Sequence, residues 1–151
     1  FSEAVFAYSE AVRVNDKFTP AIVNRATSNI MIGKTREAIG DLSRVIDIDN
    51  KCLSAYLNRA LVYKNSKRFR EAISDLTKVI RLDSGHMLAY YYRSICYEEQ
   101  GKYAQSLTDI KHALGLDNTN PSFHEQLLKV ESLSNQKDQQ DNNKSTSVMI
   151  H

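Results

Sequence analysis

Glycine and proline, the residues that most often interrupt regular structure, are scarce in this chain of 151 residues, with 5 and 2 occurrences. Turns that need special backbone angles are therefore few, and a helical chain is favoured over a strand-rich one. Cysteine occurs only twice, and Cys52 and Cys96 lie far apart with no pairing motif. A reducing, cytoplasmic compartment fits this cysteine usage best.

Two further absences concern charge of one sign and long apolar runs. Lys and Arg number 20 against 18 Asp and Glu, and the two signs are interleaved. Such a balanced surface does not attract a polyanion over distance, so nucleic acid is a poor candidate partner. No N-terminal apolar segment resembles a signal peptide or a membrane span, so we expect no membrane partner.

What the chain does contain is an internal repeat. A small residue recurs every 34 positions, at Ala4, Ala38, Ala72 and Ser106. The segment around this residue occurs in four similar copies, EAVFAYSEAVRVN, EAIGDLSRVIDID, EAISDLTKVIRLD and QSLTDIKHALGLD. A second segment alternates with it, as AIVNRATSN, AYLNRALVY and AYYYRSICY. Self-similarity at a fixed period of this length predicts a repeat architecture.

Each repeat consists of two segments with helical spacing. Tyr56, Ala60 and Tyr63 lie three or four positions apart, as residues on one face of a helix do. Thr19 and Asn120, each followed by proline, are predicted N-caps. Short turns inside the repeats are predicted at Gly33, Lys67 and Gly101, and Asp or Asn pairs end the second helices.

These signals predict the organisation of the chain. Phe1 falls inside a repeat, so we expect the sequence to be part of a longer protein. The segment after Asn120 carries Phe123, Leu127, Leu128 and Val130, which we expect on one apolar face of a capping helix. The segment after it has too little apolar surface to fold alone. The predicted parts are the second helix of a truncated repeat at 1–16, complete repeats at 19–52, 53–86 and 87–120, the capping helix at 121–136 and a polar tail at 137–151.

This register resembles the tetratricopeptide repeat family over about Phe1 to Asn120, in its order of large, small, aromatic and alanine positions. The third repeat carries the pattern best, in Tyr90, Ser94, Tyr97, Gly101, Tyr103, Ser106 and Ala113. The repeat at 19–52 departs most, with Asn29 at an aromatic position and Thr35 where Phe69 and Tyr103 stand. The resemblance implies an all-α fold, a right-handed α-α superhelix of helical hairpins, or α-solenoid, with a concave groove.

The resemblance also implies a function: a protein-protein interaction module, a scaffold or adaptor that binds a peptide or helix and is not an enzyme. The family's groove is lined by the first helix of each repeat. An alternative is an architectural spacer whose groove is filled by its own C-terminal helix; an enzyme arm or a co-chaperone is a further option. The groove positions carried over are Val23, Asn24, Thr27, Met31, Leu57, Asn58, Leu61, Lys64, Tyr91, Tyr92 and Ile95.

Chaperone-binding members of the family hold a terminal carboxylate with two lysines, two asparagines and an arginine. The corresponding residues here are Val23, Thr27, Asn58, Leu88 and Tyr92. Only Asn58 matches, so no carboxylate clamp for chaperone tails is expected. The groove is instead apolar at its centre, and apolar anchors are the predicted means of recognition.

Charged residues recur at two positions where an apolar residue would serve packing. These are Arg25, Arg59 and Arg93 in the first helices and Asp41, Asp75 and Asp109 in the second. We expect Arg–Asp pairs that join the two helices of a repeat, or neighbouring repeats, since a guanidinium can donate two hydrogen bonds to one carboxylate. A role in ligand binding is the alternative.

Motifs for catalysis or cofactors are weak. GKT at Gly33 resembles the end of a phosphate-binding loop, but Ser28 stands where the first glycine is needed and no strand precedes it. His86, His112, His124 and His151 have no partner at metal-ligand or acid–base spacing. We therefore expect neither a metal nor a cofactor.

Overall fold

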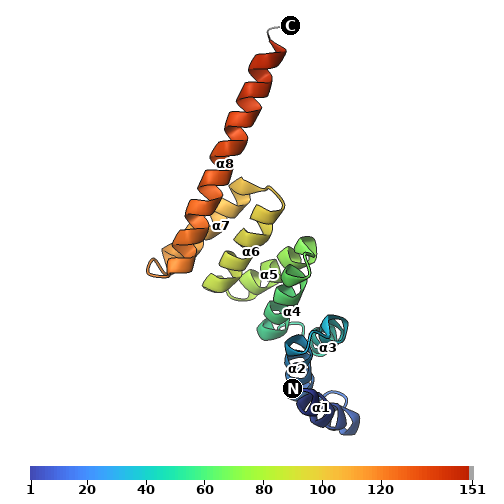
Figure 1. Ribbon diagram of the computed structural model, residues 1–151. Coiled ribbons are helices and arrows are strands. Elements are labelled where there is room, and N and C mark those ends of the chain that lie inside the picture. The colour runs from blue at the N-terminus through green and yellow to red at the C-terminus, as the bar shows by residue number, and fades with distance from the viewer. Residues whose placement is uncertain (150–151) are drawn as a thin grey trace. The chain divides into compact units, whose positions relative to one another are not determined.

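The computed structural model describes residues 1–149, and its regular elements over that range are all helices (Figure 1). The predicted all-α class is confirmed. Ile150 and His151, which belong to the predicted tail, lie outside the described residues. The helices are α1 (Ser2–Val14), α2 (Thr19–Met31), α3 (Thr35–Ile48), α4 (Leu53–Asn65), α5 (Phe69–Leu82), α6 (Met87–Glu99), α7 (Tyr103–Leu116) and α8 (Pro121–Val148).

The two predicted N-caps, Asn120 and Thr19, have different outcomes in the structure. Asn120 is the N-cap of α8 and its side chain accepts a hydrogen bond from the backbone N–H of Ser122 at 3.0 Å, as predicted. Thr19 is not an N-cap: it is the first residue of α2, Phe18 holds the cap position, and the Thr19 hydroxyl donates to the Lys17 carbonyl. Proline fits the first turn of both helices because that turn needs no N–H.

The turns inside the repeats use left-handed backbone angles. Gly33 and Gly101 have φ of 76° and 68°, and Lys67 takes the same region with φ of 59°. A backbone N–H beyond the turn then donates to the carbonyl two residues before the helix end. The Arg68 N–H, for example, donates to the Tyr63 carbonyl at 2.8 Å. This closure satisfies carbonyls that the helix end leaves free.

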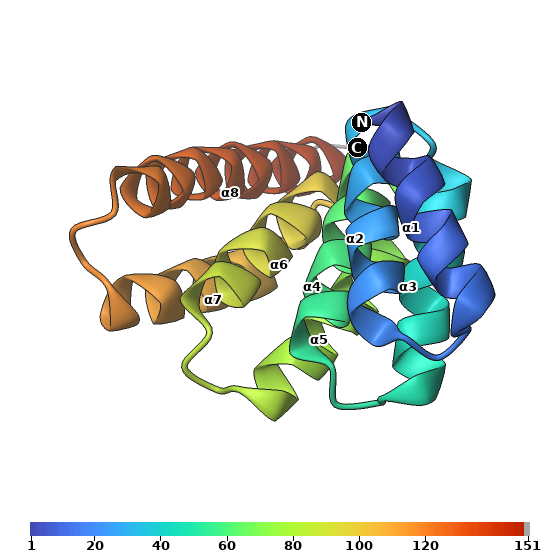
Figure 2. The same cartoon turned by 90° about the horizontal axis from the view of Figure 1, so that it is seen from below.

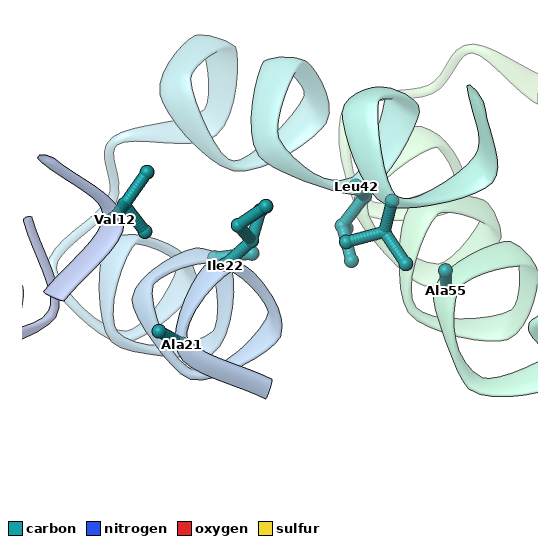
Figure 3. Packing of buried hydrophobic residues seen from close by; sticks show 7 residues of the cluster. Val12, Ala21, Ile22, Leu42 and Ala55 are labelled. Carbon is teal, nitrogen blue, oxygen red and sulfur yellow. The ribbon is translucent and has the colours of Figure 1, made fainter. Parts of the chain in front are cut away.

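The chain divides into two compact units, residues 1–84 with α1 to α5 and residues 85–151 with α6 to α8. In the first unit each helix packs on the next one along the chain. The core cluster includes the fully buried side chains of Ile22, Leu42 and Val45, and Figure 3 shows two further members, Val12 and Ala55, at its two ends. Neighbouring hairpins therefore share one core, as repeat proteins require.

Small residues stand where paired helices approach closely. Ala60 of α4 and Ala72 of α5 are fully buried. In the second unit the equivalent positions hold Ser94 and Ser106, whose hydroxyl oxygens lie 2.9 Å apart, and the Ser106 hydroxyl also donates to the Ser94 carbonyl. The two hydroxyls satisfy each other, so these buried polar groups are tolerated.

In the second unit α8 packs on α6 and α7 (Figure 2) and is longer than the predicted capping helix. Phe123, Gln126 and Val130 form its buried face, whereas Leu128 is 67% exposed, so its predicted place on that face is wrong. The helix continues past Gln136 to Val148 with exposed side chains, and Figure 1 shows this part extending beyond the α6–α7 hairpin. Extending a helix whose first turns are anchored costs little free energy per residue, which explains the difference from the expected tail.

Within residues 1–149, every helix is too short or too polar to cross a bilayer.

Candidate functional site

In the first unit, the predicted groove residues of α2 and α4 differ in exposure. Asn24, Thr27 and Met31 of α2 are exposed, and Met31 is 61% exposed. Val23 is instead half-buried and packs against the core cluster. The buried face of α2 includes Ile22, and the exposed residues follow one another at three and four positions on a different face. One face of α2 thus packs against the core and another face is exposed to solvent.

Four predicted groove residues of α4 are half-buried: Leu57, Asn58, Leu61 and Lys64. Their helix, α4, packs on α3 and α5 and also contacts α2. Apolar carbon nevertheless remains accessible at Leu57 and Leu61. The surface formed by Asn24, Thr27, Met31, Leu57, Asn58, Leu61 and Lys64 is called the α2–α4 surface below.

In the second unit, the predicted groove residues Tyr91, Tyr92 and Ile95 are half-buried on α6. The ring centroid of Tyr91 lies 5.1 Å from that of Phe123 in α8 and 5.3 Å from that of Tyr92. Burial raises the pKa of Tyr91, and Tyr92 and Glu125 add to the effect. Tyr91 therefore helps to hold α8, and less of its ring is left for a partner than the sequence alone suggests.

A polar contact between α6 and α8 was not anticipated from the sequence. Glu98 is 8% exposed, and its Oε2 accepts hydrogen bonds from Gln126 Nε2 at 3.3 Å and from Lys129 Nζ at 3.0 Å. The two donors are three residues apart on one face of α8. A buried carboxylate needs such partners, because an unpaired buried charge is costly. The three-residue spacing of Gln126 and Lys129 was the sequence signal that could have indicated this contact.

The structure brings together both members of every predicted charged pair. In the second repeat, Nε and Nη2 of Arg59 donate to the two carboxylate oxygens of Asp75, each at 2.7 Å. This is the bidentate geometry expected of strong Arg–carboxylate contacts. The pairs are Arg25 with Asp41, Arg59 with Asp75 and Arg93 with Asp109.

Two features of these pairs go beyond the sequence prediction. The hydrogen bonds to the carboxylates raise the pKa of each arginine above its ordinary value, against the opposing effect of burial. In addition, Nη1 of Arg59 donates to the Ser43 hydroxyl at 2.9 Å, and Nη1 of Arg25 reaches the Ser9 hydroxyl at 3.5 Å. Ser9 and Ser43 are one period apart, so the repeat itself carried this signal. Arg25 and Arg59 thus each join their own hairpin to the preceding helix.

Side chains able to hold a metal ion do not cluster in the described part of the chain. No cluster of three or more His, Cys, Asp or Glu residues able to hold a metal ion occurs there. The His124 ring contacts the Asn118 carbonyl at 2.7 Å, and the His112 ring stacks on Tyr90 at 4.1 Å between centroids. Gly33 lies in the turn after α2, so GKT is part of a repeat turn.

Comparison with known proteins places this geometry among characterised folds. The sequence profile of the tetratricopeptide repeat family matches residues 53–86. No curated protein matches the chain in sequence.

Solved structures give three informative similarities. MamA residues 41 to the end from Desulfovibrio magneticus RS-1 share 18% identity, with a TM-score of 0.83 over 98% of this chain and 83% of that one. The second TPR domain of human RPAP3, in complex with an HSP70 peptide SGPTIEEVD, shares 27% identity, with a TM-score of 0.69 over 72% and 90%. The first TPR of Spaghetti (RPAP3), bound to an HSP90 peptide SRMEEVD, shares 24% identity, with a TM-score of 0.73 over 76% and 90%. The chain therefore carries a tetratricopeptide repeat at residues 53–86 and has the fold of tetratricopeptide-repeat domains.

Proposed function

We propose that this chain is a non-catalytic protein-interaction module, a scaffold or adaptor that binds a peptide or helix through apolar side chains of its first helices. The observation that carries the proposal is the α2–α4 surface, where exposed Met31 is accompanied by the half-buried side chains of Leu57 and Leu61. Apolar side chains bordered by polar ones are typical of docking surfaces. Complexes of similar domains with peptides support this reading of the fold.

In the second unit we propose Tyr92 and Ile95 as further contacts of α6. A tyrosine offers a broad apolar ring with a polar tip, which is favoured at interface anchors. Tyr91 contributes less, since its ring is partly covered by Phe123.

The proposed partner is not an acidic tail. The similar RPAP3 domains are bound to peptides that end in EEVD. At the corresponding clamp positions in the first unit this chain has Val23, Thr27 and Asn58, none of which is cationic, and Val23 packs against the core cluster. Without cations held in place, the free-energy cost of desolvating a terminal carboxylate would not be offset by charged hydrogen bonds.

Two experiments test the function. Calorimetric titration of the chain with the peptide SRMEEVD should give no binding, whereas tight binding would contradict the apolar mode. Affinity capture should recover a partner with the unaltered chain and lose it with Met31→Glu or Leu61→Glu. Ser74→Glu, an equal charge change at an exposed site on α5, is the matched control. Equal capture by all variants would overturn the proposal.

A second candidate function rests on α8. Its residues Phe123, Gln126 and Lys129 contact Tyr91 and Glu98 of α6, so part of the predicted groove face in this unit is covered from within the chain. This contact favours an architectural role, in which the repeats hold their own helix and act as a spacer. Removal of α8 would then leave partner capture unchanged or increase it.

A further inference from the structure

The arginines of successive repeats have different surroundings. The guanidinium carbon of Arg59 lies 5.9 Å from the ring centroid of Tyr56 and 5.8 Å from that of Tyr63. In the first repeat, the positions of these two rings hold Ile22 and Asn29. Arg25 therefore keeps its aspartate but lacks both aromatic neighbours.

A cavity of about 350 Å³ lies beside Arg25 in the first unit. Three of its lining residues, Arg25, Asn29 and Lys34, stand one period before Arg59, Tyr63 and Arg68. In the second repeat those three are in contact, because the Arg68 guanidinium carbon lies 4.6 Å from the ring centroid of Tyr63 and Arg59 approaches the same ring. The cavity thus corresponds to the place of an aromatic ring. Its remaining lining residues are Val5, Ser9, Glu37, Gly40 and Asp41.

Asn29 marks this cavity as a place for a hydrogen-bond donor. The residue is 3% exposed, it lines the cavity, and its side-chain oxygen has no hydrogen-bond partner among the described residues. Buried side-chain oxygens are rarely left unpaired, and leaving one so is unfavourable. A guest in the cavity that donates one hydrogen bond would satisfy it once the Asn29 amide turns its oxygen towards the cavity.

The charges around the cavity select a neutral guest with an aromatic face. Arg25 and Lys34 are offset by Glu37 and Asp41, so the lining has no formal net charge. Cations nevertheless attract the face of an aromatic ring within about 6 Å of its centroid. A phenol combines the required ring and the required donor. We propose that this cavity binds the side chain of a tyrosine supplied by a partner polypeptide, in the place that Tyr63 fills within the second repeat.

The site lies among α1, α2 and α3 and does not rest on the α2–α4 surface. It can be probed with p-cresol, which is the tyrosine side chain ending at Cβ. Titration followed by amide NMR of the full chain should give saturable shifts at Asn29, Lys34 and Glu37. Toluene, which lacks the hydroxyl, and cyclohexanol, whose ring is not aromatic, should each bind at least about fivefold more weakly. Shifts elsewhere, no saturation, or equal binding of the three probes would overturn the proposal.

Variants supply matched controls. Asn29→Tyr should abolish p-cresol binding because the chain then fills its own cavity. Asn29→Leu, close in size to asparagine, should reduce p-cresol to the affinity of toluene and covers the case in which the tyrosine variant does not fold. Tyr63→Asn should create a second p-cresol site in the next repeat. Unchanged binding in both Asn29 variants would contradict the assignment.

The source of the phenol is tested with N-acetyltyrosinamide, which carries backbone amides on both sides of the tyrosine. Binding at the same residues as p-cresol is expected for a tyrosine within a polypeptide. Binding of p-cresol with exclusion of N-acetyltyrosinamide would overturn the polypeptide source and indicate a free phenol instead.

Discussion

The first and second repeats of the same unit share a backbone plan and differ in how it is filled. Both have a first helix of 13 residues and a second of 14, and both hold a bidentate Arg–Asp pair. Around that pair the second repeat has Tyr56 and Tyr63, whereas the first has Ile22 and Asn29 and a cavity. Small buried residues and the ion pair therefore maintain the hairpin in both repeats, while the aromatic positions decide whether the space beside the arginine is filled.

The largest expected effect concerns α8, which begins one period after α6 but is followed by no second helix in the described residues. Truncation after Asn120 removes the fully buried side chains of Phe123 and Val130. Each is worth about 1.5–3 kcal/mol, so the free energy of unfolding of the second unit should fall by at least about 3 kcal/mol. Urea denaturation measures the loss.

The control for that truncation is a chain ending at Gln136. No side chain between 137 and 149 is buried, so its stability should change by less than about 0.5 kcal/mol. An equal loss in both truncations would show that the exposed half of α8 also stabilises the fold.

The next effect tests the feature that the repeats share. Arg59→Leu leaves Asp75, which is 5% exposed, without its two hydrogen bonds, and should cost about 3 kcal/mol. The double change Arg59→Leu with Asp75→Leu removes both charges and should cost less than the single change. Thermal or urea unfolding of the two variants gives the comparison. Additive losses, with the aspartate change worsening the single variant, would contradict the coupling.

The fold was largely predictable because its signals are local and recur four times. Period, caps and turn residues such as Asn120 and Gly101 act within a few positions, so sequence alone indicates where helices begin and end. The Arg–Asp pairing was predictable too, since each member recurs at a fixed place. The N-cap assignment of Thr19 failed because proline at the next position fits equally well one residue later in the first turn.

The contacts of α8 were less accessible from sequence. Leu128 is a different case: it lies five residues after Phe123, about 140° around a helix, so helical spacing alone already indicated that it leaves the buried face. The contact of Tyr91 with Phe123 and that of Glu98 with Gln126 depend on which helix packs against α6. The cavity beside Asn29 is likewise a property of three helices together, although the missing aromatic residue was visible in the sequence.

A smaller change in stability is expected from exchanging residues between the two turns of the first unit. Lys67 has φ of 59° at the position where the first repeat has Gly33 with φ of 76°. A side chain in this left-handed region is disfavoured, so Lys67→Gly should stabilise the unit by about 1 kcal/mol. Gly33→Lys, the reciprocal change, should destabilise it by a similar amount. If thermal melts show Lys67→Gly to be destabilising, the lysine side chain makes a contact that outweighs the backbone cost.

The most direct test of the central claim is the salt dependence of partner binding, measured by calorimetry at low and high salt with the partner recovered by affinity capture. Apolar burial is little affected by screening, which at physiological ionic strength already acts over about 8 Å. We predict that affinity changes little with salt and that Tyr92→Glu weakens binding more than Lys64→Ala. Collapse of affinity at high salt, or a larger loss with Lys64→Ala, would contradict it and indicate an acidic ligand held by Lys64.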